Sequence, residues 1–588
     1  MVKHYISGAV ARWSRVIRNE QLVLSILAFV VGVVAAYAAI GFRLGIEFVQ
    51  SLGFGFWGEH VYTEAAKLPW WRVVLVPVFG GLLVGLGLQF LAPGHRLQGV
   101  AQVIESMRVK AGYMRLKKAL VSALLNITAL GTGASAGREG PMVHLGAALA
   151  STVAHRLHLG PGLGRTILAC GVASAVAASF NAPIAGVFFA LEVIAGQYAM
   201  SIFAPVVIAA VAGTIVTRIH LGEQLTFVIP DHAISSFWEI PAYMILGIVC
   251  AAIAVALVKS IFFAEDMAAK YKIPIWVRPA AAGLVIGILA IEFPHILGVG
   301  YQATNHALHE LFPLWMLIVL IAVKTFATAI CIGARFGGGI FSPALLIGAL
   351  TGGAYGLIAA KVFPELAAGH GAYSIVGMSA FAGAVLGAPI STIFIVFELT
   401  GDYQMTIATM IATSVASVIA QQLLGGSFFT NQLERMGVDL RSARQRAVGA
   451  SRTVRDIMTQ EFVSISGDAK ISEIVELCRG RRDWHICVVD DGRLVGAFSF
   501  IKLRDIVLDQ GELDPNSRAR DLVGAGVPFL TLDLEIINAI DRLEDTATDY
   551  LPVVDPLLND KLLGIVQYKH AMRAHDDFLR SVEASQTM

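Results

Sequence analysis

The chain has 588 residues, of which 56% are hydrophobic and only 15% are charged, and its mean hydropathy is +0.69. Soluble proteins carry about 25% charged residues, so this composition excludes an ordinary soluble enzyme and indicates a membrane protein. The formal net charge of +1 gives no reason to expect a nucleic-acid partner. Five cysteines without a CxxC pair indicate neither a metal site nor a disulfide framework.

Apolar stretches long enough to cross a bilayer recur through roughly the first 430 residues. The clearest of them are 22–41, 72–92, 203–218, 242–262, 313–332 and 404–424. The basic segment over residues 1–20 leads into the first stretch without a cleavable signal, so the positive-inside rule predicts a cytoplasmic N-terminus. We also expect a multi-pass protein of a prokaryotic inner membrane, with both termini in the cytoplasm.

The composition changes sharply near residue 433, where a polar and basic segment begins. We expect a transmembrane domain over 21–435 and a linker over 436–452. The tail that follows has the mixed charge of a soluble α/β domain and divides into two similar units, 453–507 and 519–574.

The transmembrane part contains an internal repeat, with halves over about 21–220 and 235–435. NAPI at 181–184 and GAPI at 387–390 each precede an apolar run that ends in a glutamate, Glu192 or Glu398. GREGP and GGGIFSP occupy matching places upstream. Repeated halves whose apolar segments are interrupted by Gly and Pro are typical of transporters, in which broken helices meet near the middle of the membrane. Hydropathy alone does not distinguish inverted from parallel repeats.

GREGP at 137–141 and GGGIFSP at 337–343 are both predicted to begin helices, because proline suits the first helical turn. The start of a helix offers unpaired backbone N–H groups and a partial positive charge. Two such starts could hold one anion without a buried Lys or Arg. A full cation would bind the anion too tightly for the release that transport requires.

Glu139 lies within the first of these segments. A carboxylate at an anion site competes with the passing anion, and protonation removes this competitor, so Glu139 is predicted to act as gate and proton carrier. The alternative is that Glu139 only stabilises the start of its helix and that Arg138 is an interfacial residue. For Glu192 and Glu398, which end apolar runs, capping or local pairing is favoured over a role in transport.

GREGP, FNAPIAGVFFALE at 180–192, GGGIFSP and GAPISTIFIVFELTGDYQ at 387–404 resemble the CLC family of chloride channels and transporters. The resemblance spans most of residues 20–435. It implies an all-α membrane bundle of two inverted repeats with broken helices, a homodimer with one anion pathway per subunit, and Glu139 as the gating glutamate. The residues that it implies around the anion are Gly137, Arg138, Gly140, Ile340 and Phe341.

Three positions depart from the family pattern. The family usually has an early serine where this chain has Gln98, followed by Gly99, and a late tyrosine where it has Phe429. Proton-coupled members often carry an inner glutamate where this chain has Val193. Chloride is therefore the default anion, while Gln98, which both donates and accepts hydrogen bonds, suits an oxyanion such as nitrate or bicarbonate. Because valine cannot relay a proton, we expect channel-like or weakly coupled conduction, with a proton-coupled antiporter as the alternative.

The two units of the tail resemble a tandem pair of CBS domains, which the family often carries on the cytoplasmic side. Such pairs commonly bind adenine nucleotides through a Ser or Thr and an acidic residue three positions later. Ser499 fits the first requirement, but Lys502 stands where the acid would be, and the second unit has Gln567 and His570 at these places. Dimerisation and docking without a ligand is therefore an alternative to nucleotide binding, and no cofactor is required.

Two other classes of protein are alternatives for this sequence. Residues 133–137 match G-x-S-x-G and His144 follows, as in a serine hydrolase, but that motif needs a strand–turn–helix context. Crowded Gly, Ala and Ser residues are instead typical of closely packed membrane helices. A divalent cation transporter would need clustered carboxylates, whereas this chain has isolated ones beside helix starts.

Overall fold

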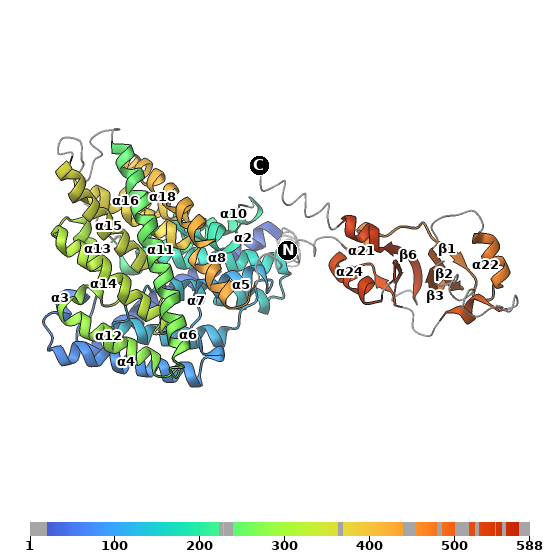
Figure 1. The fold of residues 1–588 in the computed structure, drawn as a ribbon, viewed down its shortest axis with the longest axis horizontal. Helices are drawn as coiled ribbons and strands as arrows, with labels where there is room; N and C mark the ends of the chain where they lie inside the picture. The colour runs from blue at the N-terminus through green and yellow to red at the C-terminus, as the bar shows by residue number, and fades with distance from the viewer. Residues whose placement is uncertain are drawn as a thin grey trace, which may run out of the picture. The chain divides into compact units, whose positions relative to one another are not determined.

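The computed structural model describes residues 20–574 except 197, 199, 223–226, 228–238, 363–368, 439–452, 479–484, 500–516, 524–527, 547 and 556–559 (Figure 1). The chain divides into two units, Met1–Leu440 and Arg441–Met588. Eight of the described helices are long and apolar enough to cross a membrane, and each of the six predicted spans overlaps one of them. The first unit is thus a mostly helical membrane body and the second an α/β tail, as the sequence predicted.

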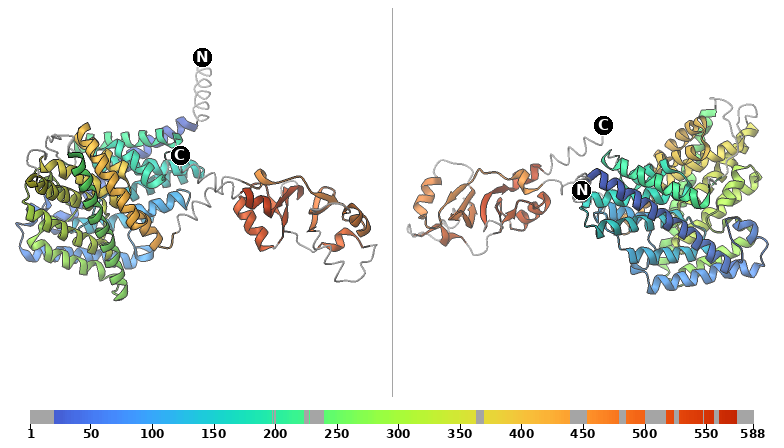
Figure 2. Two further views of the ribbon diagram at one scale, coloured as in Figure 1. Left: turned by 45° about the horizontal axis from the view of Figure 1, so that its top comes forward. Right: turned by 180° about the vertical axis from the view of Figure 1, so that it is seen from behind.

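The first half of the membrane body contains the long helices α2, α4, α8 and α10, and α2 packs beside α8 and α10 (Figure 2). Its elements are α2 (Glu20–Gly53), α3 (Val61–Ala65), α4 (Trp70–Phe90), η1 (Pro93–His95), α5 (Val100–Arg108), α6 (Leu116–Gly131), α7 (Glu139–Arg156), α8 (Pro161–Phe180), α9 (Pro183–Phe189), the π-helical turn η2 (Ala190–Ala195) and α10 (Met200–Leu221).

The second half follows the same order of long and short helices. Its elements are α11 (Ile240–Lys270), α12 (Arg278–Glu292), η4 (Pro294–Ile296), α13 (Tyr301–Leu308), α14 (Leu314–Gly333), α15 (Phe341–Val362), α16 (His370–Leu386), α17 (Pro389–Thr400), α18 (Tyr403–Leu424) and α19 (Phe428–Arg435). In each half the predicted anion motif begins one helix (α7 or α15), the next helix packs against it, and a short proline-led helix follows (α9 or α17).

Matching glycines let these helix pairs approach closely. A Cβ on Gly146 of α7 would lie 2.7 Å from the carbonyl oxygen of Gly171 on α8. A Cβ on Gly348 of α15 would lie 2.5 Å from the carbonyl oxygen of Gly377 on α16. Real side chains do not fit at such distances, so backbones meet here as they do at small-residue interfaces in membranes. The same close contact between glycines therefore occurs at matching places in both halves of the repeat.

The turn before each proline-led helix is also shared. Asn181 ends α8 and Gly387 ends α16, and both adopt the left-handed conformation, with φ of 56° and 65°. Glycine reaches this conformation without strain, and asparagine is one of the few other residues that visit it routinely. The chain can therefore reverse at once and begin the next helix at Pro183 or Pro389.

The tail forms a six-stranded sheet in the order β1-β2-β3-β6-β5-β4. Its elements are α21 (Val454–Ile457), β1 (Val463–Ile465), α22 (Ile471–Cys478), β2 (His485–Asp490), β3 (Arg493–Ser499), η5 (Ala519–Leu522), β4 (Leu530–Thr531), α24 (Ile536–Asp545), β5 (Tyr550–Asp555) and β6 (Lys561–Gln567). Each half consists of a parallel strand pair followed by an antiparallel pair. Both antiparallel pairs carry a register shift at the same place, after Val488 and after Val553, and the halves join where β3 pairs with β6.

Candidate anion-binding site

The two glycine-rich motifs, about two hundred positions apart in the sequence, meet as an isolated antiparallel bridge. The Gly137 N–H donates to the Gly339 carbonyl at 2.6 Å, and the Gly339 N–H donates to the Gly137 carbonyl at 2.7 Å. Gly338, at φ of 80°, donates its N–H to Asn126 Oδ1 at 2.6 Å. This bridge aligns the starts of α7 and α15, which begin with Glu139 and Phe341.

A cavity of about 70 Å³, here called the central cavity, lies at these helix starts. The structure brings seven of the residues named from the sequence to its wall: Gln98, Gly99, Glu139, Gly140, Ile340, Phe341 and Phe429. None of the described residues in the wall is a Lys or Arg. The first-turn amides of α7 and α15, which have no partner within their own helices, supply its positive potential.

Not every amide near this cavity is available to an anion. The amide of Gly137 is used in the bridge to Gly339. The Gly99 N–H donates to Gln102 Oε1 at 2.7 Å, and the Gln98 N–H donates to Ser122 Oγ at 2.8 Å. The start of α5 is therefore capped by the protein itself. Phe429, 5% exposed at the start of α19, brings a ring without a hydroxyl.

Glu139 is 1% exposed and its two carboxylate oxygens each accept a hydroxyl hydrogen bond. Ser342, the second residue of α15, donates to Oε2, and Tyr301, the first residue of α13, donates to Oε1. Ser342 lies within the GGGIFSP motif that the sequence had singled out. The contact between Tyr301 and Glu139 was not predicted from the sequence. No local pattern signals it, because 162 positions separate the two residues along the chain.

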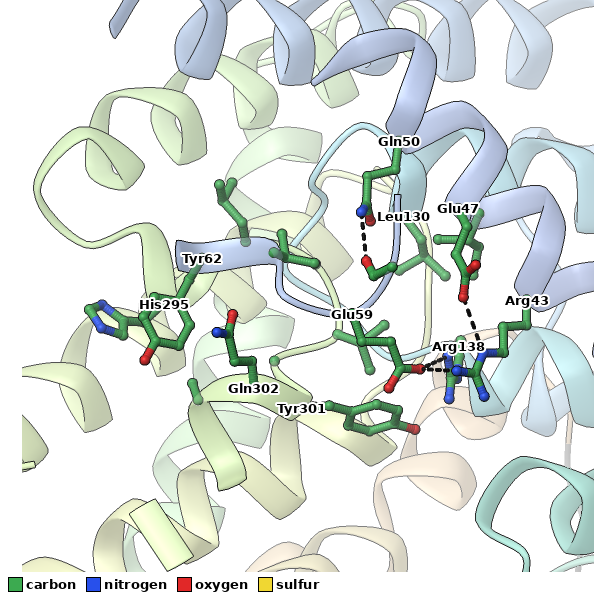
Figure 3. Close-up of a pocket in the computed structure, with 18 residues that line it drawn as sticks. Arg43, Glu47, Gln50, Glu59, Tyr62, Leu130, Arg138, His295, Tyr301 and Gln302 are labelled. Atoms are coloured by element: carbon green, nitrogen blue, oxygen red, sulfur yellow. Dashed lines mark hydrogen bonds and ion pairs between the residues drawn. The ribbon is translucent and has the colours of Figure 1, made fainter. Parts of the chain in front are cut away.

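Arg138 does not line the central cavity with its neighbours. It lines a second cavity of about 40 Å³, here called the vestibule, together with Glu59, Arg43 and Tyr301 (Figure 3). Arg138 Nη1 donates to Glu59 Oε1 at 2.9 Å, and Arg43 Nη2 lies 3.2 Å from the same oxygen. The guanidinium also stands 4.6 Å from the centre of the Tyr301 ring. Arg138 thus has an ion-pair partner and an aromatic partner, and Glu59 was not found by the sequence reasoning.

Each glutamate that ends a repeated apolar run caps the start of a helix in the other repeat. Glu192 accepts the N–H groups of Ile390 and Ser391, at 3.0 and 2.8 Å, at the start of α17. Glu398 accepts the N–H groups of Ile184 and Ala185, both at 2.8 Å, at the start of α9. These bonds occupy donors that have no partner within their helices.

The other residues named from the sequence lie away from the cavity. Val193, 6% exposed, follows Glu192 in the turn η2. Ser135 is fully buried and sits between helices rather than between a strand and a helix. In the tail, Ser499 is the last residue of β3, and Lys502 lies outside the described residues.

Comparison with known proteins identifies the same two parts. The model of the voltage-gated chloride channel family matches residues 80–421, and the CBS domain model matches residues 454–509. A putative chloride channel protein ClcB-like from Ralstonia nicotianae is 32% identical over 416 residues, which cover 70% of this chain and 96% of that protein. An H(+)/Cl(-) exchange transporter ClcA from Yersinia pseudotuberculosis is 29% identical over 418 residues, covering 69% and 86%.

Solved structures share the fold. A slow cyanobacterial Cl-/H+ antiporter superimposes with a TM-score of 0.63 at 22% identity, over 70% of this chain and 97% of the other. A eukaryotic CLC transporter gives 0.60 at 21% identity, over 93% of this chain and 97% of the other. The family consists of channels and transporters rather than enzymes, which removes the hydrolase alternative. This chain belongs to the CLC family of voltage-gated chloride channels and related transporters, and it carries a C-terminal CBS domain.

Proposed function

We propose that this protein conducts chloride, or another small inorganic anion, through the central cavity, with Glu139 as its gate. The supporting observation is the position of the Glu139 carboxylate, which lines the central cavity while its partner Tyr301 lines the vestibule. An anion that moves between the two cavities has to displace this carboxylate. Protonation removes the negative charge of Glu139 and lets the anion take its place beside the helix starts.

The gate is tested with the Glu139→Gln variant in liposomes. Chloride efflux is measured from about pH 4 to about pH 8, in steps of about one pH unit. The variant should conduct anions without pH dependence, because its amide carries no charge at any of these values. Glu192→Gln is the matched control, since that carboxylate is held by the amides of α17 and should leave the pH dependence intact. A Glu139→Gln profile that still follows the wild type would contradict the gate.

The mode of conduction that we favour is channel-like or weakly coupled, because Val193 occupies the position of the inner proton carrier. The alternative is a proton-coupled antiporter that uses another route, and the name of the Yersinia relative gives it weight. Liposomes with an imposed chloride gradient and an internal pH dye distinguish the two. Uphill proton movement would establish the antiporter, and its absence during chloride efflux would establish passive conduction.

The anion preference is proposed from the chemistry of the wall. Backbone amides at two helix starts accept any small anion, and chloride is the default. Gln98 is the residue that would favour an oxyanion, since its side chain can donate and accept. Efflux rates of chloride, nitrate, bicarbonate and fluoride, compared in wild type and Gln98→Ser, measure this preference directly.

We further infer a homodimer in a prokaryotic inner membrane with both termini in the cytoplasm. For the tail we propose a dimerisation and docking role, with adenine-nucleotide binding as the alternative. Thermal unfolding of the full chain with ATP, ADP and AMP tests the alternative, because a ligand that binds only the folded tail raises its unfolding temperature. Cross-linking in native membranes tests the dimer.

A further inference from the structure

The central cavity and the vestibule meet at the contact between Glu139 and Tyr301. The described residues that line the two cavities do not overlap, and each of these two side chains belongs to a different wall. The hydroxyl of Tyr301 donates to Glu139 Oε1, so the bond between them lies on the partition. To leave its place, the Glu139 carboxylate has to break this bond.

Tyr301 is itself held from both sides. The Arg138 guanidinium lies over its ring at 4.6 Å, and Glu59 fixes that guanidinium through the ion pair at 2.9 Å (Figure 3). The ring of Phe227 meets Tyr301 edge-on, with ring centres 5.1 Å apart. Tyr301 is 4% exposed and begins α13, so its hydroxyl is presented to Glu139 from a fixed position.

We propose that Tyr301 is a positioning residue of the gate, whose hydroxyl holds Glu139 in the blocking position and sets the pH at which the gate opens. The proposal rests on the proposed role of Glu139. A hydrogen bond donated to a carboxylate stabilises its charged form, so protonation has to work against the bond. Loss of the hydroxyl makes protonation easier, and the gate then opens at a higher pH.

The other charged groups around Glu139 and Tyr301 have hydrogen-bond partners of their own. Arg138 precedes Glu139 as the N-cap residue of α7, and Glu59 is paired with Arg138. On α14, Lys324 is 1% exposed, donates to the carbonyls of Ile296 and Gly298, and lies close to Gly300. The residues that α5, α15 and α19 contribute to the central cavity are uncharged. A change in pH dependence on removing the hydroxyl therefore reports on the bond to Glu139.

The test is the pH profile of chloride efflux from liposomes containing Tyr301→Phe. This variant keeps the ring beneath Arg138 and removes only the donor. A hydrogen bond to a charged group corresponds to roughly a ten- to hundredfold change in the ionisation equilibrium, so the midpoint should move up by about one to two pH units. At a pH above the wild-type midpoint, efflux should rise about tenfold.

Tyr243→Phe is the matched control, because Tyr243 is also buried and also donates to a carboxylate, that of Glu239, at 2.8 Å. It should leave the midpoint unchanged. Fluorotyrosine at position 301 keeps the side chain and strengthens the donor, so it should move the midpoint the opposite way, which tests the proposal even if Tyr301→Phe does not fold. A Tyr301→Phe profile that superimposes on wild type overturns the proposal, and so does an equal shift in Tyr243→Phe. The role of Glu139 fails separately, if Glu139→Gln keeps its pH dependence.

Discussion

Replacing Glu398 by alanine should destabilise the membrane body and leave the pH dependence of transport unchanged. Its carboxylate accepts two backbone N–H groups of α9, both at 2.8 Å. Without it, these first-turn donors lose their acceptor, and each unsatisfied buried donor costs about 1–3 kcal/mol. Because Ile184 is 39% exposed while Ala185 is buried, we expect a total loss of about 2 kcal/mol. For a chain of this size the apparent Tm should fall by about 2 °C.

The assay heats the purified variant in detergent and follows the folded fraction by size-exclusion chromatography, alongside the pH profile of efflux from liposomes. Glu192→Ala, its counterpart in the other repeat, should lose slightly more, because Glu192 also accepts the Ser391 hydroxyl at 2.5 Å. The capping explanation would be refuted if either variant kept the thermal stability of the wild type and showed a shifted pH profile of efflux. The carboxylate concerned would then belong to the transport pathway.

Three further outcomes are expected. Gly348→Val should abolish folded protein in detergent chromatography, since its Cβ would lie 2.5 Å from a carbonyl oxygen of α16, whereas Gly41→Ala, where nothing lies within 4 Å, should leave the yield unchanged. Asn181→Ala should lower the stability in a thermal scan by about 1–2 kcal/mol, because its φ of 56° strains alanine and its Oδ1 also accepts Arg218 Nε at 2.8 Å. Phe429→Tyr should add a hydroxyl to the central cavity and raise chloride efflux relative to nitrate; an unchanged ratio would mean that this ring does not contact the anion.

The two helix starts at the central cavity could be located from the sequence because their chemistry is local, whereas Gln98 and Phe429 were named only through the family resemblance. A glycine-rich turn, a proline and an apolar run specify the start of a helix whatever surrounds it, and Gly140 and Phe341 do line the cavity. The contacts across the chain could not be found in this way. Tyr301 and Glu59 come from segments without a distinctive pattern, and they reach the site only in the folded chain, where α13 packs against α15 and α16.

The direction of Arg138 shows a second limit of local reasoning. It precedes Glu139 by one position, and successive residues at a helix start point about 100° apart around the axis. Neighbours in the sequence can therefore face different spaces, as these two do, with Arg138 in the vestibule and Glu139 in the central cavity. The pattern GREGP places both residues at the site but does not assign each to a cavity.

Three of the carboxylates beside helix starts, Glu139, Glu192 and Glu398, differ in the kind of donor that holds them. Glu192 and Glu398 are each bound by backbone amides of a helix in the other repeat, which cannot move away without unwinding that helix. Glu139 is held by two side-chain hydroxyls rather than by the amides of a helix, and it borders the central cavity. The same attraction of a carboxylate for a helix start can therefore be permanent in two places and releasable in the third. The kind of donor that holds Glu139 and the space beside it are what suit this carboxylate to the proposed gating role.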